Sequence, residues 1–173
     1  DMALLDTQVA MLANLGANYL VACQYEDKVP GRAGNAHANI VPYQVFETAP
    51  SADGNKDHLI LAVGNDSQYI KFCKVADRPD LSADARFATN ANRVRHRDVL
   101  IPILEEILKS RTKAVWLSAL EVEKVPCGAI NNLAEVFADP HIRSRQMVTH
   151  WEHPARGTLE LTSSPMKLSA TPV

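Results

Sequence analysis

The sequence predicts a small α+β domain, preceded by an apolar helix and followed by further strands. Two strand-like runs, residues 43–48 and 58–63, come first and flank a turn at Asp53 and Gly54. Several short helical segments follow, and a weakly alternating stretch over residues 147–168 comes last. Strands and helices that are grouped along the chain, rather than alternating, are typical of α+β architecture.

The composition is that of a globular protein. The chain has 173 residues, of which 46% are apolar and 22% charged, and its formal net charge is −2. Because this charge is small, neither nucleic acid nor a membrane surface is expected as a partner. Cys23, Cys73 and Cys127 form no CxxC pair. Each is expected to be a small buried apolar residue, and a reducing cytoplasm is the natural compartment.

The first segment, residues 2–24, has the composition of a buried helix. Asp6 is its only charge, and its apolar side chains are spread around the whole helical circumference. Such a helix has to be covered on most sides. Gln8, Asn14 and Asn18 argue against a membrane span, and the lack of a basic leader argues against a signal peptide. We expect a core helix of a larger domain, and both chain ends look cut. Without that domain, the helix should be exposed or should pair with a second copy.

A linker and a hairpin are expected next. Residues 25–39 contain glycines and mixed charge and have no periodicity, which predicts a linker. Pro42 precedes the first strand. The alternation of residues 43–48, the turn region 49–57 and the apolar run 58–63 together predict an antiparallel hairpin.

Asn65 and Gln68 predict the start of the first helix after the hairpin. An Asn followed three residues later by a Gln resembles a capping box, which satisfies backbone N–H groups of the first turn. We expect this helix over residues 67–76. Pro79 should end the region, and residues 80–89 are expected to be a short irregular or helical stretch.

A longer helix is expected from Asn90 or Asn92 to about residue 110, with a kink or break at Pro102. The remaining expected elements are a helix over 112–124, a strand-like run over 125–130, a helix over 133–137 capped by Asn131 or Asn132, a short helix opened by Asp139 and Pro140, and a hairpin over 147–168.

Two polar clusters invite a functional interpretation. His150 and His153 are three residues apart on an expected strand, where they point to opposite faces, and no further ligand has a zinc-like spacing, so we expect no metal site. A basic cluster is formed by Arg86, Arg93, Arg95, His96 and Arg97. We expect it to pair with Asp84 and Asp98 and to face water. The alternative is a contact to a nucleotide or CoA phosphate, since arginine binds phosphate well.

Residues 34–39 are small and polar and come immediately before the first strand. Such a segment is either a plain interdomain linker or a loop that lies over a ligand and excludes water.

Several motifs along the chain share their order and spacing with a known family. They are DMALLDTQ at 1–8, GNAHANIVPYQVFET at 34–48, AVGND at 62–66, RFATN at 86–90 with Arg93 and Arg97, VPCGAIN at 125–131, DPH at 139–141 and RQMV at 145–148. In these motifs the sequence resembles CoA-transferase family III, the CaiB/BaiF group. It is similar in particular to members that move CoA between dicarboxylic acids, such as succinate–hydroxymethylglutarate CoA-transferase.

The resemblance implies a domain plan. Members are longer than this chain, have a large Rossmann-like domain built from both chain ends, and carry a small α+β domain inserted between them. By this plan residues 1–24 are a helix of the large domain and residues 25–42 are the crossover linker and active-site loop. Residues 43–148 are the small domain of antiparallel hairpins and helices, and residues 149–173 return toward the large domain.

The resemblance also implies an activity. The family's catalytic aspartate attacks the acyl-CoA thioester and forms an aspartyl anhydride. That aspartate is expected upstream of Asp1, so this chain should hold no catalytic residue and should be inactive alone. The implied substrates are an acyl-CoA thioester and a small carboxylic acid. The resemblance implies a homodimer and no tightly bound cofactor or metal.

One active-site element is expected within the chain. In some members a glycine-rich loop closes over the anhydride and shields it from water, and by position it matches His37, Ala38, Asn39 and Ile40. The glycines are absent here, so His37 or Asn39 could instead contact the acyl group. Residues 50–57 are longer than the usual turn, which should only lengthen the hairpin.

Two other interpretations stay open. The related α-methylacyl-CoA racemases share the fold but use an acid–base pair for proton transfer. Residues 40–47 favour the transferases. The chain could also be a non-catalytic interaction module or an inactive fragment.

Overall fold

The computed structural model describes residues 2–22, 25, 29–32 and 34–171. The chain divides into two compact units, Asp1–Ala129 and Ile130–Val173. The predicted division at residues 24, 42 and 148 stays a prediction.

The first unit contains a three-stranded antiparallel sheet. Its strands are β1 (Tyr43–Glu47), β2 (His58–Ala62) and β3 (Cys127–Ala129), in that spatial order. Tyr43 lies opposite Ala62 and Glu47 opposite His58, which confirms the predicted hairpin. The strand-like run near residue 127 adds the third strand to the other edge of β2.

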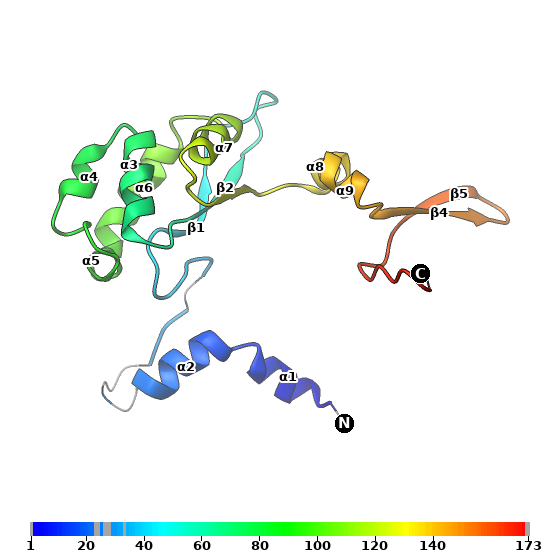
Figure 1. The fold of residues 1–173 in the computed structure, drawn as a ribbon, viewed down its shortest axis with the longest axis horizontal. Coiled ribbons are helices and arrows are strands. Elements are labelled where there is room, and N and C mark those ends of the chain that lie inside the picture. Colours follow the sequence, from blue (N-terminus) through cyan, green and yellow to red (C-terminus); the bar gives the residue numbers. More distant parts are fainter. Residues whose placement is uncertain (1, 23–24, 26–28, 33, 172–173) are drawn as a thin grey trace. The chain divides into compact units, whose positions relative to one another are not determined.

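Helices pack around this sheet (Figure 1). They are α3 (Asp66–Val75), α4 (Pro79–Ala83), α5 (Asn90–Arg95), α6 (Arg97–Leu108) and α7 (Lys113–Val122). The buried residues of α6, Leu100, Leu104 and Leu108, are four apart and so form one apolar stripe. They belong to one core with Leu59 and Trp116.

The first helix of this group begins much as predicted, with one difference in its cap. The Asn65 side chain accepts a hydrogen bond from the Gln68 N–H at 3.0 Å. The Gln68 side chain, however, accepts from the Gly64 N–H at 2.7 Å, one residue earlier than in a capping box. Both side chains therefore bind the backbone at the turn that leads out of β2.

The long helix expected over residues 90–110 is two helices, and the predicted break at Pro102 is wrong. The chain leaves helical geometry at His96, between α5 and α6, while Pro102 lies inside α6. Pro102 is exposed, so water can reach the carbonyl that its missing N–H leaves unbonded. The cap is also different: Thr89, not Asn90 or Asn92, accepts from the Asn92 N–H at 3.3 Å.

The leading segment is two helices, α1 (Leu4–Ala10) and α2 (Ala13–Ala22), rather than one. No described side chain in either is buried, and Leu4 and Leu20 are 86% and 63% exposed. These helices are thus exposed, which is one of the two outcomes predicted for this segment. No helix among the described residues is long and apolar enough to cross a membrane. The predicted end of this segment at Gln24, and Cys23, lie outside the described residues.

The second unit confirms the elements predicted for it. Asn132, rather than Asn131, caps α8 (Leu133–Ala138) in a complete capping box with Glu135. Asp139 caps α9 (Pro140–Ser144) by accepting from two backbone N–H groups. The hairpin consists of β4 (Val148–His153) and β5 (Gly157–Thr162), paired antiparallel.

Candidate active-site loop

Residues 34–42, here called the loop, fold back onto the start of β1. The His37 N–H donates to the Tyr43 carbonyl at 2.9 Å. The two rings stack, with centroids 5.3 Å apart and an angle of 15° between their planes. The Asn39 N–H donates to Nδ1 of His37 at 3.0 Å. Asn35 accepts from the Val45 N–H at 3.2 Å. Residues of the loop and the first strand thus fix the His37 backbone and ring together.

Arg97, the first residue of α6, holds the middle of the loop. Its Nη2 donates to the carbonyl oxygens of Ala38, at 2.7 Å, and His37, at 3.3 Å. A guanidinium that bonds two successive carbonyls restricts both peptide groups, because hydrogen bonds from a charged donor are stronger than neutral ones.

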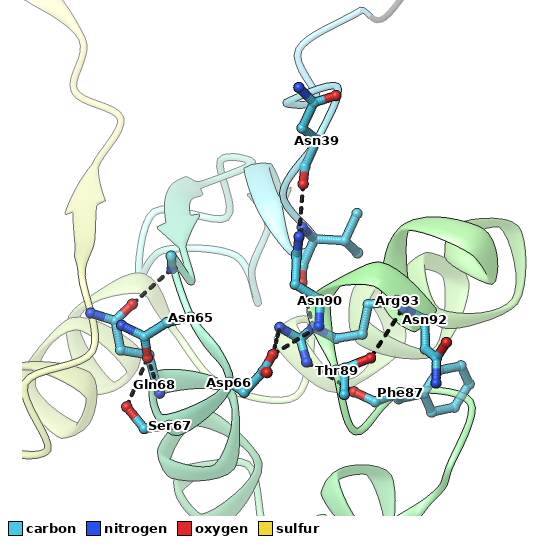
Figure 2. A network of polar contacts seen from close by, with 12 residues as sticks. Asn39, Asn65, Asp66, Ser67, Gln68, Phe87, Thr89, Asn90, Asn92 and Arg93 are labelled. Atoms are coloured by element: carbon cyan, nitrogen blue, oxygen red, sulfur yellow. Dashed lines mark hydrogen bonds and ion pairs between the residues drawn. The ribbon is translucent and has the colours of Figure 1, made fainter. Parts of the chain in front are cut away.

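Asn90 holds the end of the loop, as Figure 2 shows. Its side-chain amide donates to the Asn39 carbonyl at 2.8 Å and accepts from the Val41 N–H at 3.1 Å. A neighbouring β-strand would bind the Asn39 carbonyl and the Val41 N–H in the same way, with one donor and one acceptor. The Asn90 backbone N–H in turn donates to Oδ1 of Asp66 at 2.8 Å.

Arg93 links the loop to the core. Its side chain is fully buried. Nε donates to the Val41 carbonyl at 2.6 Å, Nη1 to the Phe87 carbonyl at 2.9 Å, and Nη2 to Oδ1 of Asp66 at 2.8 Å. The guanidinium also lies 4.3 Å from the centre of the Tyr69 ring. We call Asp66, Asn90 and Arg93 the loop anchor, since Asp66 joins the other two (Figure 2).

The basic cluster predicted from the sequence is therefore not one patch. Arg86 pairs with Asp84 at 2.7 Å, as expected, and this ion pair lowers the pKa of Asp84. Arg95 donates to Asn92. Arg93, expected to face water, is buried, because three acceptors and an aromatic ring surround it. Each of its three nitrogens donates a hydrogen bond within the protein, and the side chain is fully buried, so a phosphate in solvent cannot reach it.

A pocket of about 460 Å³ lies between the loop and α6. It is lined by Arg32, Ala36, His37, Ile40, Val41, Gln44, Arg97, Asp98, Ile101 and Pro102. The aliphatic side chains form an apolar wall, and the charged residues of the lining are Arg32, Arg97 and Asp98. A site with an apolar wall and a few polar groups suits a small molecule with a short aliphatic body and an anionic end. Asp98, expected to pair with the basic cluster, lines this pocket.

Of the four predicted loop residues, His37 and Ile40 line the pocket. Ala38 and Asn39 contribute the carbonyls that Arg97 and Asn90 hold. The roles of Asp66 and Asn90 were missed: both residues stood out only as part of family motifs or helix starts. No local signal joins Asn90 to a loop 51 residues earlier.

The two histidines at 150 and 153 are not brought together. His150 lies 3.4 Å from Glu160 across the second hairpin, while the His153 ring packs edge-on against Trp151. Within the described ranges no three His, Cys, Asp or Glu side chains are grouped so that they could hold a metal.

The described cysteines are poor nucleophiles. Cys73 is fully buried, as predicted, and burial raises its pKa to about 11. Cys127 is partly buried, and burial raises its pKa as well. Because the thiolate is the reactive form, neither thiol is suited to attack a thioester.

Comparison with known proteins places these features in context. The whole chain, residues 1–173, matches the model of CoA-transferase family III. Human succinyl-CoA:glutarate CoA-transferase is 38% identical over 169 residues, which are 98% of this chain and 36% of the relative. The succinate–glutarate CoA-transferase of Agrobacterium fabrum is 39% identical over 173 residues, 100% of this chain and 41% of the relative.

The fold agrees with solved structures. The crystal structure of a CaiB/BaiF family protein from Brucella suis is similar with a TM-score of 0.75 at 38% identity, over 99% of this chain and 42% of that one. A Mycobacterium tuberculosis protein shows the same fold with a TM-score of 0.74 at 20% identity. The chain thus spans less than half the length of the relatives it matches.

Proposed function

The chain belongs to CoA-transferase family III, and we propose that the complete protein transfers CoA from an acyl-CoA donor to a carboxylate acceptor. The observation that carries the proposal is the family match along all 173 residues. The named relatives act on succinyl-CoA and glutarate, which supports small dicarboxylic acids as the substrate class.

We assign the covalent chemistry to an aspartate outside residues 1–173. Its carboxylate attacks the thioester carbonyl, the CoA thiolate leaves, and a mixed anhydride remains on the enzyme. The anhydride then has to meet CoA or a carboxylate before it meets water. The loop at His37, Ala38, Asn39 and Ile40 supplies part of the cover over that intermediate. Its position beside a pocket with an apolar wall supports this role.

The proposal has further features, which family membership and the unpaired cysteines support. The acyl-CoA is a substrate rather than a resident cofactor, and no other cofactor takes part. The complete enzyme is a homodimer that works in the cytoplasm. The 173-residue chain alone does not turn over.

The test is a transfer assay with the complete protein that carries this chain. Succinyl-CoA and glutarate are mixed with the enzyme, and CoA esters are separated by chromatography and identified by mass. Formation of glutaryl-CoA together with free succinate is the expected result. A protein that instead exchanges the α-proton of a 2-methylacyl-CoA in deuterated water, with no transfer to any carboxylate offered, is a racemase and refutes the proposal.

A further inference from the structure

We propose that His37 is a fixed hydrogen-bond donor in the site that binds the carboxylate substrate, and that its Nε2–H binds a carboxylate oxygen of this small dicarboxylic acid. This inference rests on the proposed transferase function and adds to it a residue and the atom it contacts.

The position of the ring is set by its neighbours. The His37 backbone is held by the Tyr43 carbonyl on one side and by Arg97 on the other. The ring stacks on Tyr43, and Nδ1 is occupied by the Asn39 N–H. A polar side chain that is held at its backbone, at one ring face and at one ring nitrogen has little rotational freedom left.

The hydrogen bond to Nδ1 also fixes which nitrogen carries the proton. A nitrogen that accepts a hydrogen bond is unprotonated, so in the neutral imidazole the proton lies on Nε2. Among the described residues, none accepts a hydrogen bond from that Nε2–H. The ring lines the pocket between the loop and α6. It therefore offers the pocket a donor rather than an acceptor.

The surroundings select an anionic oxygen as the partner. Arg97 and Arg32 line the same pocket, against Asp98 as the acidic residue, so the local charge favours an anion. Ile40, Ile101 and Pro102 offer an apolar wall for a short methylene chain. A small dicarboxylate combines these two properties: one carboxylate end can bind at His37 while the chain lies on the apolar wall.

Three substitutions separate the loss of the hydrogen-bond donor from the loss of the ring's shape. His37→Asn keeps an oxygen near the position of Nδ1, which can still accept from the Asn39 N–H, but it removes the distal donor. His37→Gln places an amide N–H near the position of Nε2. His37→Phe keeps the stack on Tyr43 and removes both nitrogens. Each variant is made in the complete protein, and its thermal unfolding is compared with wild type.

Variants that lack the Nε2–H group should recognise glutarate, the carboxylate that receives CoA, less well. His37→Asn and His37→Phe should lower kcat/KM for glutarate about 10- to 100-fold, as for one hydrogen bond to a charged group. His37→Gln should recover most of that loss. The proposal is overturned if the Asn and Phe variants stay within about twofold of wild type, or if the Gln variant is as poor as the Asn variant.

A second measurement keeps this inference distinct from the transferase proposal. Protein labelled with ¹⁵N-histidine is titrated with glutarate, and the Nε2–H resonance lost in the His37→Asn variant is followed. A shift of that resonance in a protein without transferase activity would support the His37 contact and reject the reaction. Transfer activity with an unmoved resonance would reject the contact and leave the reaction standing.

Discussion

Replacing Arg93 tests whether the loop and the core are one structural unit. Arg93→Leu removes three hydrogen bonds and the contact with Tyr69 from a fully buried site. Leu keeps part of the aliphatic contact, so the loss is mainly polar. The carbonyls of Val41 and Phe87, residues that are 3% and 0% exposed, are left without this donor.

The magnitude follows from those two carbonyls and the ion pair. Each buried acceptor left unsatisfied costs about 1–3 kcal/mol. Asp66 contributes less, because its side chain is 49% exposed and its carboxylate can be rehydrated. We expect Arg93→Leu to lower the free energy of unfolding by about 3–5 kcal/mol. This is a large fraction of the roughly 5–15 kcal/mol typical of a domain.

The assay is urea unfolding of the chain followed by fluorescence. A Trp151→Phe background leaves Trp116, which is fully buried in the first unit, as the only tryptophan reporter. Arg95→Leu is the matched control, since Arg95 is exposed and, within the described part of the chain, donates only to Asn92. The control should change stability by less than about 0.5 kcal/mol. If both variants cost the same, or if Arg93→Leu costs under about 1 kcal/mol, Arg93 does not anchor the loop to the core.

Three further predictions concern the loop, a buried thiol and the leading helices. Asn90→Ala should speed amide exchange of Val41 about 5- to 30-fold by removing its acceptor, while Asn92→Ala should not; equal rates in both would contradict the anchor. Between pH 9 and 11 the wild type should lose up to about 1.4 kcal/mol of stability per pH unit more than Cys73→Ala. The sign follows because burial raises the pKa of Cys73 in the folded state, so the thiol of the unfolded chain loses its proton at a lower pH and rising pH favours unfolding. Urea midpoints that fall equally in wild type and Cys73→Ala would refute this prediction. The isolated chain should self-associate through its exposed apolar helices, so light scattering should show a monomer only after residues 2–22 are removed.

Local sequence patterns predicted most helices and strands correctly. They failed where a side chain bonds to residues far away in the sequence. Asp139 and Asn132 cap the helices that follow them, and their capping depends on residues no more than three positions away. Asn90 was expected to cap a helix in the same way. Its side chain bonds to residues 39 and 41 instead, so the cap falls to Thr89.

The same reason explains why the charged cluster was misjudged. A run of arginines near two aspartates predicts a solvated surface, and Arg86 follows that rule. Arg93 departs from it because its acceptors come from residues 41, 66 and 87, which only the folded chain brings together. The pocket beside the loop was beyond prediction for the same reason: its lining comes from Arg32, from part of residues 36–44 and from part of residues 97–102.

The contacts of the loop also decide which part of it can move. Asn39 and Val41 are held by Asn90 and Arg93, and Arg93 is part of the core, so this end cannot shift without the cost expected for Arg93→Leu. At the other end, Asn35 accepts from the Val45 N–H through a hydrogen bond that is exposed. Gly34 there has a φ of 62°, a conformation that glycine adopts at little cost. Opening of the loop should therefore begin at Gly34 and stop before His37, whose backbone Tyr43 and Arg97 hold.

Glycines at residues 37–40 are then unnecessary for such a movement, because the hinge lies before them. Gly34→Ala should strain the observed conformation, since a Cβ disfavours that φ, and should therefore speed amide exchange at residues 34–36. Ala38→Gly should leave the end at Asn39 in place. Amide exchange across residues 34–41 can measure both. A loop that exchanges faster at Val41 than at Ala36 would show that the fixed end is not where the anchor lies.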